Sequence, residues 1–165
     1  MTAISPAERA GRSPGALADV APDLAAILAG TRPSVLAWPP EAISRETVSM
    51  ATRDGTLLAT ELYRPPVARV PAIAVRTPYG RRTLETAYLA LARAGYAVVA
   101  QDCRGTGDSE PEHWDFYLYE REDSLDFVSW VTGQDWHDGF LGAMGGSYVG
   151  GTQWCMAMHH WVPPT

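Results

Sequence analysis

A short apolar run that leads into a serine surrounded by glycines constrains the fold of this chain more than any other feature. The run is Phe140–Met144, and Ser147 follows it between glycine pairs at 145–146 and 150–151. Glycines suit a point where a strand turns sharply into a helix, because the backbone is strained there and the two elements pass close together. The pattern is typical of a nucleophile elbow, which exposes a serine hydroxyl at the N-terminus of a helix.

The rest of the sequence predicts strands that alternate with helices. Two β-rich runs come first and are separated by Arg53-Asp54-Gly55, in which Asp-Gly is a strong hairpin signal. The predicted strands are Glu46–Thr52, Thr56–Tyr63, Ala72–Arg76, Ala97–Gln101 and Phe140–Met144, and the predicted helices are Thr83–Ala94, Glu122–Thr132 and Tyr148–His159. This alternation predicts an α/β fold with a mostly parallel sheet and an N-terminal antiparallel hairpin.

Apolar spacing also predicts the inward faces of two helices. The face of the helix over 83–94 is formed by Leu84, Ala87, Tyr88 and Leu91, and that of the helix over 122–132 by Leu125, Val128 and Val131.

Composition excludes several kinds of chemistry. The net charge of −6 argues against a nucleic-acid binder, which needs a basic face to neutralise phosphates. All 13 basic residues are arginine, so a Schiff-base lysine, a P-loop lysine and a Ser-Lys dyad are excluded. Cys103 and Cys155 lack metal-ligand spacing and are too few for a disulfide framework, and we expect both to be reduced thiols.

Residues 1–45 are rich in Ala, Pro and Gly and predict a partly disordered leader with one short helix, Leu17–Leu28. No run in the chain reaches the roughly 20 apolar residues that span a bilayer. The N-terminus also has no apolar signal-peptide core. We therefore expect a cytoplasmic location and no membrane partner.

Five motifs in a fixed order resemble one family. They are Arg53-Asp54-Gly55, Thr77-Pro78-Tyr79-Gly80, the run from Gln101 to Ser109, Trp136-His137-Asp138-Gly139, and the glycine–serine run from Gly145 to Gly151. Together they are similar to the X-Pro dipeptidyl peptidase and cocaine esterase group of α/β-hydrolases. That family's elbow is Gly-x-Ser-Tyr-x-Gly, so Val149 agrees with it although the general form Gly-x-Ser-x-Gly has a glycine there.

The resemblance implies a serine hydrolase that cuts an ester or an amide through an acyl-serine intermediate. Ser147 would be the nucleophile, and the backbone N–H of Tyr148 and the phenol of Tyr79 would be the oxyanion donors. No metal or organic cofactor is implied, and the ligand would be a small-molecule ester or a short peptide. Asp102 and Arg104 resemble a turn that ties down the loop beside the elbow, and a catalytic Asp102 is the alternative.

A serine hydroxyl needs an adjacent base, and in this family the histidine and the acid follow the serine well downstream. His159 and His160 would lie roughly 18 Å from Ser147 along the helix that leaves it. His137 precedes the incoming strand and would lie roughly 20 Å away, at that strand's far end. His113 starts from the correct edge of the sheet, but we expect a solvated loop histidine there.

The sequence stops at Thr165, soon after the helix that follows Ser147. We therefore expect residues 46–165 to be the N-terminal part of a catalytic domain, an incomplete α/β-hydrolase fold without the downstream histidine and acid. The strand Phe140–Met144 would then be a sheet edge, open to self-association or to a complementing chain. Two alternatives to an active hydrolase stay open: an inactive truncated remnant, and one half of a split hydrolase.

The segment from Asp108 to Asp126 is both acidic and aromatic. It contains eight carboxylates and one arginine, with four rings interleaved: Trp114, Phe116, Tyr117 and Tyr119. We expect a solvated loop whose last carboxylates favour a helix N-terminus. The alternative is a wall of the site that attracts a substrate ammonium group, while the spacing supports no metal site.

Overall fold

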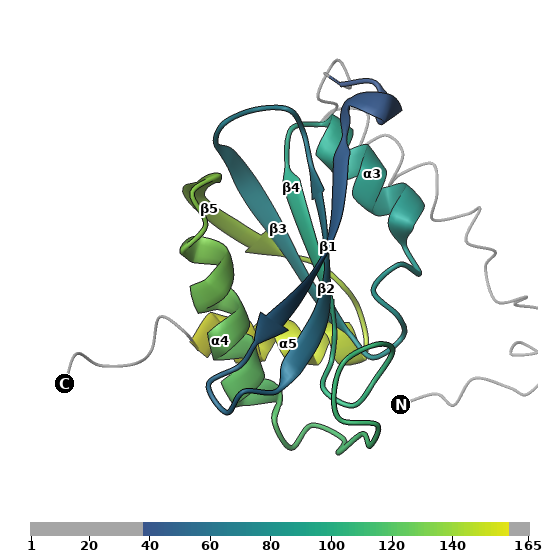
Figure 1. Cartoon of the computed structure of the whole chain (residues 1–165), viewed down its shortest axis with the longest axis vertical. Helices are drawn as coiled ribbons and strands as arrows, with labels where there is room; N and C mark the ends of the chain where they lie inside the picture. The colour runs from purple at the N-terminus through teal and green to yellow at the C-terminus, as the bar shows by residue number, and fades with distance from the viewer. Residues whose placement is uncertain (1–37, 159–165) are drawn as a thin grey trace, which may run out of the picture. The chain divides into compact units, whose positions relative to one another are not determined.

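The computed structural model describes residues 38–158, which form a five-stranded sheet with helices on both faces (Figure 1). The strands are β1 (Ser44–Ala51), β2 (Leu57–Arg64), β3 (Val70–Thr77), β4 (Ala97–Asp102) and β5 (His137–Ala143), and the helices are η1 (Pro40–Ala42, a 3₁₀ turn), α3 (Glu85–Arg93), α4 (Glu120–Thr132) and α5 (Tyr148–Ala157). The expected helix Leu17–Leu28 lies outside the described residues, as do His159 and His160.

The sheet is mixed, with the strand order β1-β2-β4-β3-β5. The predicted hairpin is confirmed, because β1 and β2 pair antiparallel and Gly55 takes a positive φ of 86° in the turn between them. β2 then pairs antiparallel with β4, while β3 pairs parallel with both β4 and β5. The expectation of a mostly parallel sheet therefore holds only for β3, β4 and β5, since the hairpin adds its antiparallel strands to the same sheet.

Strand β4 is buried along its whole length because its two faces meet two different layers. Ala97 and Val99 pack in a cluster with residues of α4 and α5, whereas Val98 and Ala100 pack in a second cluster with residues of α3. Side chains that alternate between faces explain why this strand is continuously apolar. Figure 1 shows the same layers, with α4 and α5 on one side of the sheet and α3 on the other.

The predicted inward face of α4 is confirmed, and that of α3 is only half right. Leu125, Val128 and Val131 are all buried against the sheet. In α3, the buried residues are Tyr88 and Ala92, one turn apart. Leu84 lies on the same row but just before the first turn, where its backbone is not helical, and it is 50% exposed.

The carboxyl ends of the three parallel strands bring three of the five sequence motifs to one edge of the sheet. β3 ends at Thr77, β4 at Asp102 and β5 at Ala143, so the loops that follow them start side by side. Open α/β sheets place their binding sites at this edge. Ser147 and Tyr79 are carried there by β5 and β3.

Strand β5 is an edge strand within the described residues, where it pairs only with β3. It begins at His137, three residues before the predicted start at Phe140. The His137 ring is buried, and its Nε2 lies 3.0 Å from the carbonyl oxygen of Phe140. Phe140 itself is 58% exposed, so the open edge carries apolar surface.

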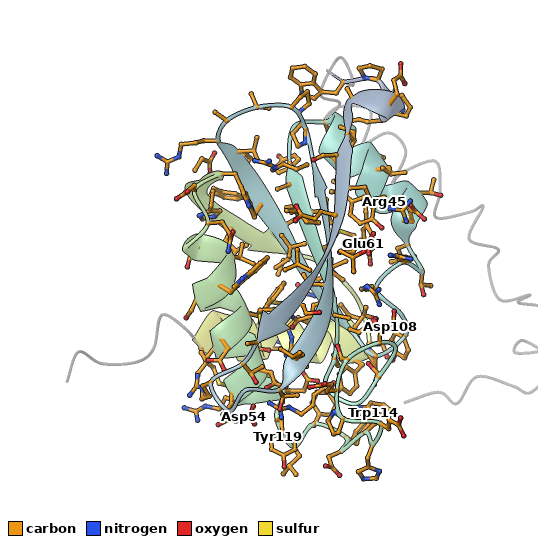
Figure 2. All side chains as sticks on the ribbon, viewed as in Figure 1. Arg45, Asp54, Glu61, Asp108, Trp114 and Tyr119 are labelled. Carbon is orange, nitrogen blue, oxygen red and sulfur yellow. The ribbon has the colours of Figure 1, made fainter. Side chains whose placement is uncertain are left out.

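A buried carboxylate on β2 holds the outer strands to the first helix. Glu61 is 1% exposed and binds the guanidinium groups of Arg45 at 3.2 Å and Arg82 at 2.9 Å, with Thr47 donating a third bond at 3.0 Å. Figure 2 shows Arg45 and Glu61 together on the side of the sheet that α3 covers. Burial disfavours the charge, yet the bonds from Arg82 and Thr47 outweigh it and lower the pKa of Glu61.

We expect Glu61→Gln to lower the free energy of unfolding by roughly 1.5–3 kcal/mol at pH 7, because hydrogen bonds to charged groups are lost. The pKa of Glu61 is lower in the folded state than in the unfolded state, so its contribution is full above the unfolded value and disappears as pH falls through the folded one. Urea unfolding between pH 7 and pH 3 should therefore bring variant and wild type together in acid. A difference that stays constant with pH would contradict this.

Candidate active site

The backbone at Ser147 has the strained geometry of an elbow. Its φ of 57° and ψ of −129° fall where residues other than glycine are rare, and α5 begins at the next residue. Such strain costs about 1–3 kcal/mol and persists only where the surroundings enforce it. The Ser147 side chain is exposed, so its hydroxyl is presented to solvent at the N-terminus of a helix.

Two glycines let α5 pass close to its neighbours. A Cβ on Gly145, whose φ is 141°, would lie 2.1 Å from Cγ1 of Val149. A Cβ on Gly151 would lie 2.3 Å from the hydroxyl of Tyr117. The Gln153 side chain then donates a 2.7 Å bond to the carbonyl of Gly145, which fastens the helix to the strand end. Close packing therefore requires glycine at 145 and 151, whereas a Cβ on Gly146 or Gly150 would meet no close contact.

Tyr79 lies beside Ser147, although 68 positions separate them in sequence. Its hydroxyl is 3.5 Å from Oγ of Ser147, and its side chain is 57% exposed. The main chain of Tyr79 is held on both sides, because its N–H donates to Oγ1 of Thr77 at 3.0 Å and its carbonyl accepts from Oγ1 of Thr83 at 2.6 Å. The loop after β3 therefore holds the main chain of Tyr79 in place beside the elbow.

Asp102 is occupied in tying the loops together. Its carboxylate accepts the backbone N–H of Arg81 at 2.5 Å and a guanidinium N–H of the same residue at 2.6 Å, and it also accepts the backbone N–H of Asp108. A Cβ on Gly107 would lie 2.2 Å from Asp102 Oδ2, so glycine is needed for the turn to close on the carboxylate. These contacts support the structural reading of Asp102.

Arg104 joins the same loop to the hairpin turn and to α4. Its guanidinium donates to Asp123 at 2.7 and 3.0 Å and to Asp54 at 2.9 Å, and it lies 4.5 Å from the ring centre of Tyr119. Figure 2 shows Asp54 and Tyr119 at the same end of the molecule. The bonds from Arg104 and Thr52 hold the pKa of Asp54 well below its ordinary value.

No pattern in the sequence pointed to the most buried charge near the elbow. Arg76 is 0% exposed and donates to Glu120 Oε2 at 2.5 Å, to Gln101 Oε1 at 2.8 Å and to Ser124 Oγ at 2.8 Å. Glu120 in turn accepts a 2.9 Å bond from the hydroxyl of Tyr148. A chain of charged and polar groups thus leads from the sheet to the residue after Ser147.

Many carboxylates of the segment from Asp108 to Asp126 are paired rather than simply solvated. Glu120 and Asp123 are buried against Arg76, Asp126 binds Arg53 at 2.7 Å, and Asp108 lies 2.8 Å from Arg81. The alternative of an ammonium-attracting wall is weakened, because much of the negative charge is neutralised within the fold.

Three of the four aromatic residues of that segment gather around Tyr148. The Tyr117 ring stacks on it with centroids 4.0 Å apart and planes 23° apart, and Trp114 and Phe116 approach it at 5.6 and 5.4 Å. Figure 2 places Trp114 at the loop end of the sheet. Burial, and next the charge of Glu120, raise the pKa of the Tyr148 phenol, so it stays a hydrogen-bond donor at neutral pH.

Neither histidine among residues 38–158 bonds to Ser147. His113 is exposed, with its Nε2 3.0 Å from Asp115 Oδ1, and His137 Nε2 lies against the carbonyl of Phe140. The expectation of a solvated loop histidine at position 113 agrees with this exposure.

The two cysteines are free thiols, and burial raises the pKa of both. In the described part of the chain, no group of three or more His, Cys, Asp or Glu residues could hold a metal ion. Of the helices over residues 38–158, none has the length and apolar content required to cross a membrane.

A mixed sheet in which a strand turns through a strained serine into a helix is typical of the α/β-hydrolase fold. The sequence profile of the X-Pro dipeptidyl-peptidase (S15) family matches residues 54–163. The chain therefore belongs to this family, which acts on small ester or peptide substrates.

Individual relatives agree with this assignment. The chain is 42% identical over 118 residues to the cocaine esterase of Rhodococcus sp. (strain MB1 Bresler), a match that covers 67% of this chain and 20% of the esterase. An aminopeptidase from a marine sediment Thaumarchaeota archaeon is similar in structure, with a TM-score of 0.59, 28% identity, and coverage of 69% of this chain and 23% of that one. A CocE/NonD family hydrolase from Staphylococcus aureus gives a TM-score of 0.59 at 25% identity, covering 70% and 24%. The chain thus spans about a fifth to a quarter of these relatives' lengths.

The strain at the elbow has a measurable cost. We expect Ser147→Gly to raise the free energy of unfolding by about 1 kcal/mol, because glycine takes a positive φ without penalty. Ser147→Ala is the matched control, since it removes the hydroxyl but keeps the Cβ and the strain, and it should stay close to wild type. Denaturant unfolding of the three proteins checks this, and a glycine variant less stable than the alanine variant would contradict it.

Proposed function

We propose that this chain carries the nucleophile and both oxyanion donors of a serine hydrolase that cleaves an ester or amide bond through an acyl-serine. The observation that carries the proposal is the pairing of the Tyr79 hydroxyl with Ser147 Oγ at 3.5 Å on a strained elbow. Membership of the S15 family supports it, because the family acts on ester or peptide bonds. No cofactor has a part in this chemistry.

The geometry suits acyl transfer. Ser147 Oγ would attack the substrate carbonyl and pass its proton to a base, and the carbonyl oxygen would become an oxyanion. The first N–H groups of a helix have no partner within the helix, so the N–H of Tyr148 is available to that oxyanion. The Tyr79 hydroxyl would donate the second bond. Collapse would release the alcohol or amine, and water would then hydrolyse the acyl-serine.

The base and the acid are proposed to come from outside residues 38–158. Neither His113 nor His137 bonds to Ser147, and Asp102 is committed to Arg81 and Asp108. In such hydrolases the acid and the histidine follow the serine in chain order. The residues described here thus supply the nucleophile and the oxyanion donors of the site.

The open side of β5 favours a second candidate, one half of a split hydrolase. A hollow of about 640 Å³ runs along this strand and is lined by residues of β5, α4 and α5, including Phe140, Leu141 and Met156. Backbone groups and apolar side chains at an unpaired edge suit the addition of further strands. A polypeptide that adds there could bring the histidine and the acid.

Labelling with a fluorophosphonate tests the proposal, because Ser147 Oγ would displace fluoride and place the phosphonyl oxygen in the oxyanion site. Because the base and the acid are proposed to come from outside residues 38–158, we expect Ser147 to be labelled when they are supplied, and this labelling to be lost in Ser147→Ala. Tyr79→Phe should slow labelling by about 10²–10³-fold, the usual effect of losing one oxyanion donor. Mass spectrometry of the adduct locates the modified residue and gives the rate.

The outcomes separate the candidates. Labelling of Ser147 in the isolated chain supports a base within reach of the serine. Labelling that needs a co-purifying polypeptide assigns the chain to a split hydrolase. A chain that stays unlabelled under both conditions is the inactive remnant, and the proposed activity would then be withdrawn.

A further inference from the structure

The side chain of Tyr148 is anchored more firmly than a packing role requires. It is 5% exposed, and its hydroxyl donates a 2.9 Å bond to Oε1 of Glu120. The Tyr117 ring covers one face of it at 4.0 Å, and Tyr117 itself holds a positive φ of 61° and donates its hydroxyl to the Tyr148 carbonyl at 3.3 Å. The aromatic ring, the hydroxyl and the main-chain carbonyl of Tyr148 are therefore all restrained.

Glu120 cannot turn away from the Tyr148 hydroxyl. Its other oxygen, Oε2, accepts a 2.5 Å bond from Arg76, and its side chain is 5% exposed. Arg76 is fixed in turn by Gln101 at 2.8 Å, and Gln101 donates to Thr60 Oγ1 at 2.9 Å. The anchor thus reaches through the ends of β3 and β4 to β2, elements that the sheet already holds rigid.

The charge balance of this anchor also suits a site that must stabilise a negative charge. A buried carboxylate near the elbow would by itself oppose an oxyanion, because like charges interact strongly away from water. Arg76 is paired with Glu120, and Asp123 lies 3.6 Å from its Nη2 and is also bound to Arg104. The arginines therefore offset the carboxylates while Glu120 remains a strong acceptor.

We propose that Glu120, held by Arg76, is a positioning residue that fixes Tyr148 so that its backbone N–H points at the oxyanion. This rests on the proposed function, in which that N–H is one of two donors. A positive φ at Ser147 relaxes unless the residues around it resist, and the anchored ring of Tyr148 lies on the first residue that would have to rotate. Glu120 acts through Tyr148 and does not contact substrate.

Tyr148→Phe tests this inference by removing one hydroxyl and keeping the ring. The matched control is Tyr63→Phe, because Tyr63 is also buried but its hydroxyl has no hydrogen-bond partner among the described residues. The peptide unit between Ser147 and Tyr148 carries both the Tyr148 N–H and the Ser147 carbonyl, and that carbonyl accepts from the amides of Gly150 at 2.9 Å and Gly151 at 3.2 Å. Two properties of the full chain are therefore measured in each variant: hydrogen exchange of the Gly150 and Gly151 amides by NMR, and the rate of fluorophosphonate labelling at Ser147.

We expect Tyr148→Phe to speed exchange of the Gly150 and Gly151 amides by about tenfold or more, because the Ser147 carbonyl that accepts from them turns with the Tyr148 N–H, and to slow labelling by a similar factor, relative to Tyr63→Phe. Glu120→Gln keeps an acceptor for the Tyr148 hydroxyl and should lie between wild type and Glu120→Ala. A purely structural loss would speed exchange at all core amides together, so amides of β4 serve as the internal reference.

Two results would overturn the inference: exchange at Gly150 and Gly151 within twofold of the Tyr63→Phe control, or an increase shared equally by the β4 amides. Failure of the wild-type chain to label would count against the proposed function alone. In that case the exchange measurement still decides whether Glu120 and Tyr148 hold the peptide unit that follows Ser147.

Discussion

Arg76 carries a full positive charge with no exposed surface, and a buried charge is stable only where opposite charge and hydrogen bonds surround it. Glu120, Asp123 and Gln101 meet that requirement, so β3, β4 and α4 are brought to one point. Removing one partner of a buried ion pair costs about 3–5 kcal/mol, a large share of the roughly 5–15 kcal/mol that stabilises a domain. Because Tyr148 is bonded to Glu120, the elbow depends on the same charge.

The strands and helices of residues 38–158 follow from patterns that are local in sequence. Continuous apolar runs predicted β3 and β4, and Asp54-Gly55 predicted the hairpin of β1 and β2. Strand order could not be predicted in this way, because pairing of β2 with β4 joins segments about 40 residues apart and no local pattern records it. The face of α3 was half wrong for a related reason: Leu84 and Tyr88 lie on one stripe, and only the sheet selects which residues of the stripe become buried.

The residues of the candidate site were predicted mainly from the resemblance to a known family, and less from the physical chemistry of the residues themselves. Ser147 is marked by its glycines, but nothing near Tyr79 in the sequence shows that its phenol reaches a serine 68 residues away. Arg76 and Glu120 escaped prediction because charged residues at the ends of strands and helices are ordinarily exposed. The acidic segment was expected to be solvated because the arginines that neutralise it, Arg76 and Arg104 among them, come from other parts of the chain.

Strand β4 lies between β2 and β3, so neighbours in the sheet are not neighbours along the chain. During synthesis the β1–β2 hairpin can close as soon as it emerges, whereas β3 emerges with neither of its partners made. Both edges of β3 pair with strands that come later, β4 and then β5. An apolar strand with two open edges is prone to aggregate while it waits. The time needed to translate from the end of β3 to the end of β4 therefore sets how long β3 stays without a partner.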